Sequence, residues 1–189
     1  MLFEQVSLIV NGYPVEAFYQ RPFANAKGYH SKTLSYSIWH IFRIEDIVAH
    51  TLIAGDEQLL VTSDYLKKID SPIITTGNEL HGQEILEFSK KLNIKASFTY
   101  AKEVMLSTNS ILSNLEYAQM KTKYSDANRE ILAETGCVSP NENALWLKSR
   151  LCLYGNMGRK LFLRYMIGFM RGLILPKRKR FWGRICVKD

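Results

Sequence analysis

The sequence of 189 residues has little of what several protein classes require. It contains three cysteines, Cys137, Cys152 and Cys186, and no closely spaced pair, which argues against a disulfide framework and a cysteine-based zinc site. Five prolines and 11 glycines, without repeats or low-complexity tracts, argue against a fibrous or disordered chain. Because 47% of its residues are apolar, we expect the chain to bury the core of one ordinary domain.

Long apolar runs are also missing. The N-terminus lacks the basic start and the apolar stretch of a signal peptide, and no run of about 18 apolar residues indicates a membrane span. We therefore expect a cytoplasmic protein.

Acidic residues are nearly absent from the C-terminal part. The formal net charge is +7, yet residues 148–189 hold 12 of the 25 Lys and Arg residues and one of the 18 acidic residues. The charge predicts two parts, a body over residues 1–147 and a basic segment over residues 148–189. This segment either completes the fold of the body or is atypical, and a frameshifted end of the gene is a further hypothesis.

Apolar residues recur at helical spacing through most of the body, and no convincing alternating strand pattern appears after residue 30. This pattern predicts an all-α helical bundle. A helix predicted over residues 33–54 has an apolar stripe made of Leu34, Ile38, Ile41, Phe42, Val48 and Leu52. The other predicted helices cover residues 14–20, 57–69, 83–92, 94–115 and 126–135, and a further helix is expected to start at Ser139-Pro140.

Histidines facing the inside of a bundle can hold a metal ion, and imidazole suits zinc and nickel. The sequence has four, His30, His40, His50 and His81. On a helical wheel His40 lies on an apolar side of the helix 33–54, whereas His50 falls on a polar side with Arg43 and Asp46. We expect that polar side to face solvent and Arg43 and Asp46 to pair on the surface. For each histidine, a hydrogen-bonded structural role is the alternative interpretation.

Glu45 falls in the middle of the apolar stripe. A carboxylate in that position needs an ion-pair partner, a metal ion or a water-filled cleft. An ion pair with a neighbouring helix is the interpretation that we favour.

The stretch Trp39-His40-Ile41-Phe42-Arg43-Ile44-Glu45-Asp46 resembles the second-helix signature of the DinB family, in which Trp and His precede Arg-x-Glu-Asp. Residues 76–89, 94–115 and 138–147 are also similar to that family, so the resemblance covers about residues 30–147. The resemblance implies a four-helix bundle with up-up-down-down connectivity, extra short helices and formation of homodimers.

The resemblance also implies a divalent metal, zinc or nickel, bound by one histidine on the second helix and two on the last. His40 matches the second-helix position, but the chain has no histidine after His81 to supply the last-helix pair. Glu45, His50 and His81 are weaker candidates for metal ligands. The function implied is metal-dependent hydrolysis or thiol transfer on an unidentified small molecule, with an incomplete histidine site.

A different class of function follows from the basic segment. The run Lys177-Arg178-Lys179-Arg180, followed by Phe181 and Trp182, is suited to contact phosphates and stack on a base. The alternative hypothesis is therefore a non-enzymatic helical bundle that binds a partner, an anionic membrane or nucleic acid through this tail.

Overall fold

The computed structural model describes residues 11–21, 31–116, 119, 126–142 and 144–145. Within these residues the chain is helical and has no strand, which confirms the all-α prediction. No helix among them is long and apolar enough to cross a membrane. The elements in chain order are α2 (Val15–Tyr19), α3 (Leu34–Asp46), η2 (Ile47–Ala54), α4 (Leu59–Thr62), α5 (Tyr65–Lys68), α6 (Gly82–Lys91), α7 (Ile94–Ser113) and α9 (Asp126–Glu134).

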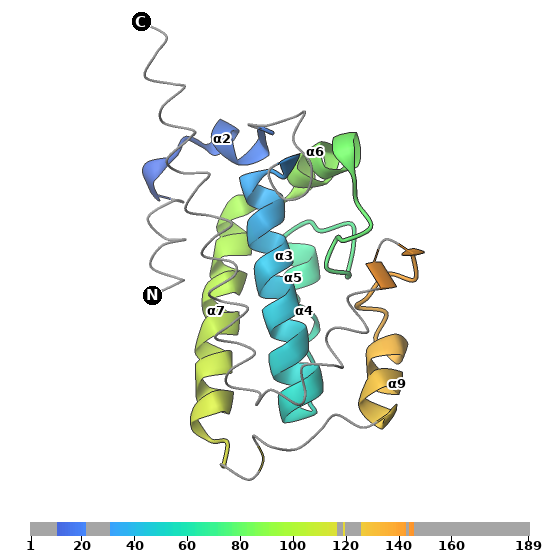
Figure 1. Ribbon diagram of the computed structural model, residues 1–189. Helices are drawn as coiled ribbons and strands as arrows, with labels where there is room; N and C mark the ends of the chain where they lie inside the picture. Colours follow the sequence, from blue (N-terminus) through green and yellow to red (C-terminus); the bar gives the residue numbers. More distant parts are fainter. Residues whose placement is uncertain (1–10, 22–30, 117–118, 120–125, 143, 146–189) are drawn as a thin grey trace, which may run out of the picture.

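The helices α3 and η2 form one continuous rod through the centre of the described part (Figure 1). The rod begins where the Thr33 hydroxyl accepts a hydrogen bond from the backbone N–H of Tyr36 at 3.0 Å. After Asp46 the backbone widens into the π-helix η2, which ends at Gly55 in the left-handed conformation, with φ +74°. Every residue from Ser35 to Ile53 is buried except His40, which is half-buried. This burial is expected of a helix covered on several sides.

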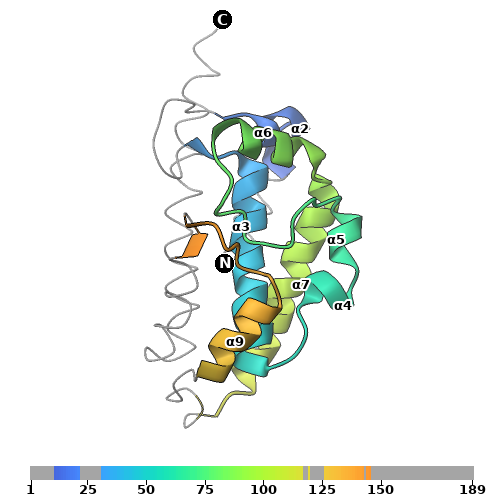
Figure 2. The ribbon, with the colours of Figure 1, turned by 90° about the vertical axis from the view of Figure 1, so that its right-hand side faces the viewer.

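The long helix α7 lies along the rod and runs in the same direction (Figure 2). Tyr100 contacts Asp46, and Ser107 contacts His50 further along both helices. In the expected up-up-down-down order, the second and third helices run in opposite directions. The pair α3 and α7 runs parallel, and the up-up-down-down order of the whole bundle stays a prediction. The chain can make the parallel pair because residues 55–93 return it to the beginning of the rod before α7 starts.

Two apolar clusters cover the two ends of the rod. The first lies around Trp39 and Phe42 and includes side chains of α2, α6 and the first half of α7. The second lies around Ile47 and Val48 and includes Leu132 of α9. Figure 1 shows the corresponding arrangement, with α2 and α6 at the top of the rod and α9 beside its lower end.

The predicted helix over residues 57–69 is instead two short helices, α4 and α5. Asp64 lies between them with φ 53°, a left-handed conformation that interrupts an α-helix. The remaining helices end close to the predicted positions, and Gly136, with φ +60°, follows α9 as expected. Near the end of the described part, the Ser139 hydroxyl accepts the N–H of Asn141 at 3.3 Å, but the first helical residue is Glu142. His30 and the basic segment 148–189 lie outside the described residues.

Candidate functional site

One face of α3 holds the connection between α5 and α6. Four side chains, from Tyr36 and from the residues three, four and seven positions after it, donate hydrogen bonds to the four consecutive backbone carbonyl groups of residues 74–77. We call this set the loop clamp. Its donor–acceptor pairs are Tyr36 Oη to Gly77 at 2.8 Å, Trp39 Nε1 to Thr75 at 3.1 Å, His40 Nδ1 to Thr76 at 2.7 Å and Arg43 Nε to Ile74 at 2.8 Å.

The loop clamp supplies hydrogen-bond donors to backbone carbonyl groups of the connection. Residues 74–77 belong to no helix or strand that would pair their carbonyl groups, although Gly77 also accepts the N–H of Leu80 at 3.1 Å. Lys32 extends the same arrangement, since its Nζ donates to the Leu80 carbonyl at 3.2 Å. Trp39, His40 and Arg43 therefore all bind backbone carbonyl groups and position this connection.

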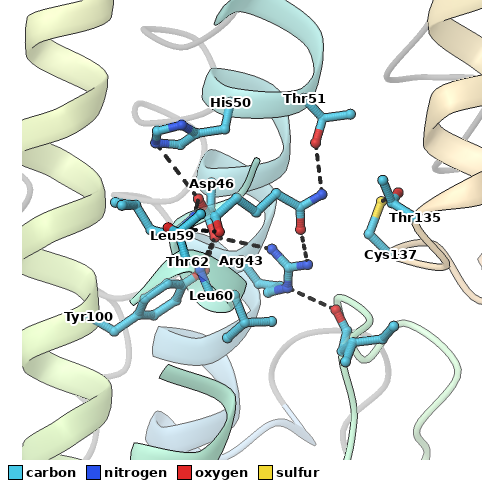
Figure 3. Close-up of polar contacts among 12 residues, drawn as sticks. Arg43, Asp46, His50, Thr51, Leu59, Leu60, Thr62, Tyr100, Thr135 and Cys137 are labelled. Carbon is cyan, nitrogen blue, oxygen red and sulfur yellow. Dashed lines mark hydrogen bonds and ion pairs between the residues drawn. The ribbon is translucent and has the colours of Figure 1, made fainter. Parts of the chain in front are cut away.

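Asp46 is the centre of a second network, one turn further along α3 (Figure 3). Its side chain is completely buried and accepts hydrogen bonds from four donors on three helices. The donors are the backbone N–H of Leu59 at 2.9 Å, the backbone N–H of Leu60 at 3.0 Å, Tyr100 Oη at 2.7 Å and Arg43 Nη1 at 3.3 Å.

These contacts make Asp46 the N-terminal cap of α4. The first N–H groups of a helix have no partner within the helix, and Gln58, which precedes α4, caps none of them. Asp46 supplies that acceptor from a different helix. Burial, reinforced by the Asp46 carboxylate, raises the pKa of Tyr100 well above its usual range, so the phenol stays protonated and donates.

Arg43 connects the two networks. Its Nε belongs to the loop clamp, its Nη1 donates to Asp46, and its Nη2 donates to the side-chain oxygen of Gln58. Gln58 in turn donates to the Thr51 hydroxyl at 2.7 Å. The prediction of a surface pair was wrong, because Arg43 and Asp46 are 1% and 0% exposed. The polar side of the rod is interior because the connection 55–77 covers it.

His50 lies on the same interior side and is 5% exposed, so the prediction that it faces solvent was also wrong. Its Nε2 lies 3.9 Å from Asp46 Oδ1, as expected for residues four apart on one helical side. Its Nδ1 lies 2.7 Å from Asp56 Oδ1, and Nε2 lies 3.0 Å from the Ser107 hydroxyl of α7. Sequence reasoning did not single out Ser107.

Glu45 is buried on the side of the rod that faces α7, as its place in the apolar stripe predicts. Among the described residues no cation lies within ion-pairing distance, so the favoured ion pair is not found there. Burial raises the pKa of Glu45 to about 7, while the nearby Thr108 hydroxyl opposes the rise and the charge of Asp46 adds to it. A carboxyl group that titrates near neutral pH therefore lies between α3 and α7.

The other histidines are separate from these networks. His81 is exposed and precedes α6, where its backbone N–H donates to Glu84 at 2.9 Å. Within the described ranges, no group of three His, Cys, Asp or Glu side chains is placed to hold a metal ion. His40, Glu45, His50 and His81 are therefore not brought together as one ligand set.

Comparison with known proteins adds no relative. No protein-family model matches this sequence, and no curated protein is significantly similar to it.

The buried position of Asp46 predicts a large effect for Asp46→Asn. The amide can no longer accept on both sides, and the Arg43 guanidinium loses its counter-charge, so we expect the free energy of unfolding to fall by about 3–5 kcal/mol. Chemical denaturation measures this loss. The matched control is Asp70→Asn at an exposed position, for which we expect a change below about 0.5 kcal/mol. Equal effects of the two variants would show that Asp46 has no special structural role.

Glu45→Gln is expected to change the pH dependence of stability. Since the folded protein raises the pKa of Glu45 from 4.5 to about 7, it binds this proton more tightly than the unfolded chain does. The free energy of unfolding should therefore fall by about 3 kcal/mol in total as the pH rises from about 4.5 to about 7. The Glu45→Gln variant, which lacks this titrating group, should not show that decrease. Denaturation at pH 5 and pH 8 tests this, with the exposed Glu87→Gln as control. A Glu45→Gln effect that is the same at both pH values would contradict the assignment.

Proposed function

We propose that this chain is a DinB-like four-helix bundle protein, a metal-dependent hydrolase or thiol transferase with an incomplete histidine site in which His40 is the metal ligand. In this proposal the α3–η2 rod is the helix that carries the second-helix stretch of the family. The sequence likeness of the Trp39–Asp46 stretch supports the relation to the family. The hydrogen bond of His40 to the Thr76 carbonyl is the observation that carries the functional part.

That bond determines the state of the imidazole. A carbonyl oxygen only accepts, so Nδ1 of His40 carries the proton and the lone pair of the neutral ring lies on Nε2. Histidines that bind metals are commonly held this way, with the second ring nitrogen donating to a backbone carbonyl or carboxylate. The ring is also stacked on Tyr36, with centroids 5.5 Å apart and an interplanar angle of 12°. His40 thus has a fixed orientation and tautomer suited to a ligand.

The accessibility of His40 supports the same proposal. It is the one residue between Ser35 and Ile53 that is half-buried, whereas all the others are buried. Among the described residues no group of three His, Cys, Asp or Glu side chains is placed to hold a metal ion, so a site with three such ligands would need residues outside the described ranges. A zinc or nickel ion bound there would lower the pKa of a coordinated water or thiol.

Metal binding tests this proposal directly. We expect the full chain, loaded with Ni²⁺ or Zn²⁺ and desalted, to retain about one ion per chain. His40→Asn keeps a side-chain donor for the Thr76 carbonyl but lacks Nε2, so its metal affinity should fall by more than about tenfold. His81→Asn is the matched control and should bind as the unaltered chain does. Isothermal titration and elemental analysis provide the measurement, and equal binding by His40→Asn would overturn the proposal.

A second candidate function is binding of a polyanion through the basic segment. It is favoured by the charge distribution, since residues 148–189 hold 12 of the 25 basic residues and a single acid. In this reading the bundle is a non-enzymatic support, and Lys177, Arg178, Lys179 and Arg180 contact phosphate groups of nucleic acid or of an anionic membrane.

Changing Lys177–Arg180 to four glutamines tests this second function. If these side chains contact DNA phosphates, the slope of log K against log salt should become shallower by roughly 3 to 4 units. Filter binding to duplex DNA and sedimentation with anionic vesicles measure the two possible targets. Exposed Lys67 and Lys68, changed to glutamine, are the control for general loss of charge. An unchanged salt slope and unchanged vesicle binding would exclude a role for the four residues.

A further inference from the structure

A separate polar cluster lies at the η2 end of the rod, ten residues beyond His40 and thus about 15 Å away along the helix axis. It combines side chains from three segments: His50 from η2, Asp56 from the turn that follows, and Ser107 from α7. Asp56 Oδ1 lies 2.7 Å from His50 Nδ1, and the Ser107 hydroxyl lies 3.0 Å from His50 Nε2. The imidazole therefore joins a carboxylate on one side to a hydroxyl on the other.

The direction of these hydrogen bonds follows from the acceptor. An ionised carboxylate only accepts, so His50 Nδ1 donates to Asp56. In the neutral ring Nε2 then has the lone pair, and Ser107 must donate its hydroxyl proton to it. A serine whose proton already points at a base, oriented in turn by a third group, is the geometry of an activated nucleophile.

Two further features fit this geometry. Asp46 Oδ1 lies 3.9 Å from His50 Nε2, where its negative charge stabilises the imidazolium that proton transfer would form. Exposure increases from His50, which is buried, through the half-buried Ser107 to Asp56, whose side chain is 58% exposed. The cluster therefore lies at the edge of the core and is exposed on its Asp56 side.

The π-helix places His50 in this cluster. The widened turns of η2 end with the N–H groups of Gly55 and Asp56 both donating to the His50 carbonyl, at 2.7 and 3.1 Å. This brings Asp56 back beside the ring of His50. Single π-helical turns occur frequently at functional sites, although they are rare elsewhere.

We propose that Ser107 is a nucleophile that accepts acyl groups from small carboxylic esters, with His50 as general base and Asp56 as a positioning residue. His50 Nε2 takes the Ser107 proton as the serine oxygen bonds to the ester carbonyl carbon. The bond from that carbon to the leaving oxygen breaks, and Nε2–H protonates the departing alcohol. Water then adds to the acyl-serine with its proton taken by Nε2, which returns that proton to the serine oxygen as the carboxylic acid leaves.

A fluorophosphonate probe tests this assignment on the full chain. The serine oxygen displaces fluoride from phosphorus, which leaves a stable adduct that mass spectrometry can locate. We expect labelling at Ser107 in the presence of excess chelator, and also in His40→Asn. The result is therefore independent of the metal proposed above.

Three variants distinguish a reactive serine from a purely structural network. Ser107→Ala should abolish labelling, whereas Ser110→Ala, at an exposed position one turn along α7, should be labelled as the unaltered chain is. Asp56→Asn should leave the unfolding midpoint nearly unchanged because the side chain is exposed, yet slow labelling at least tenfold, as expected when a base loses its orienting group. No adduct at Ser107, or an undiminished rate in Asp56→Asn, would overturn the proposal.

Discussion

The described structure depends on one buried carboxylate. Asp46 is 0% exposed and accepts hydrogen bonds from Arg43, from Tyr100 and from two backbone N–H groups of α4. A charge in that position is stable only with such donors, because burial without them costs several kcal/mol. Since the donors belong to three different helices, satisfying one side chain fixes the relative positions of α3, α4 and α7.

The loop clamp likewise provides hydrogen-bond partners to polar groups, at the far end of the connection 55–77. Asp46 holds the beginning of α4, and the four clamp side chains hold residues 74–77, so the chain between them is attached to α3 at both ends. Most polar groups of the Trp39–Asp46 stretch are thereby engaged with backbone. His40 takes part in this clamp through Nδ1, and the His50 cluster lies beyond the stretch, where it contacts side chains instead of backbone.

The sequence predicts the helices well because apolar spacing reports local periodicity. Apolar spacing does not indicate which segment covers the polar side of a helix. The helical wheel placed Arg43, Asp46 and His50 on one side correctly, but that side is interior only because the folded connection 55–77 packs against it. The break at Asp64 and the widening at η2 depend likewise on tertiary contacts. Ser107 had no sequence signal, since an isolated serine off the apolar stripe of a helix is ordinary and its partners lie more than fifty residues earlier. Glu45 was found because a carboxylate within an apolar stripe is unusual in itself.

Native-state hydrogen exchange of the Leu59 and Leu60 amides tests the anchoring role of Asp46 most directly. Both N–H groups lie at the start of a four-residue helix, where exchange is ordinarily fast. If Asp46 holds them as described, both amides should exchange as slowly as the central amides of α3, through global unfolding alone. Exchange at the fast rate of exposed turn amides, while α3 stays protected, would contradict the account.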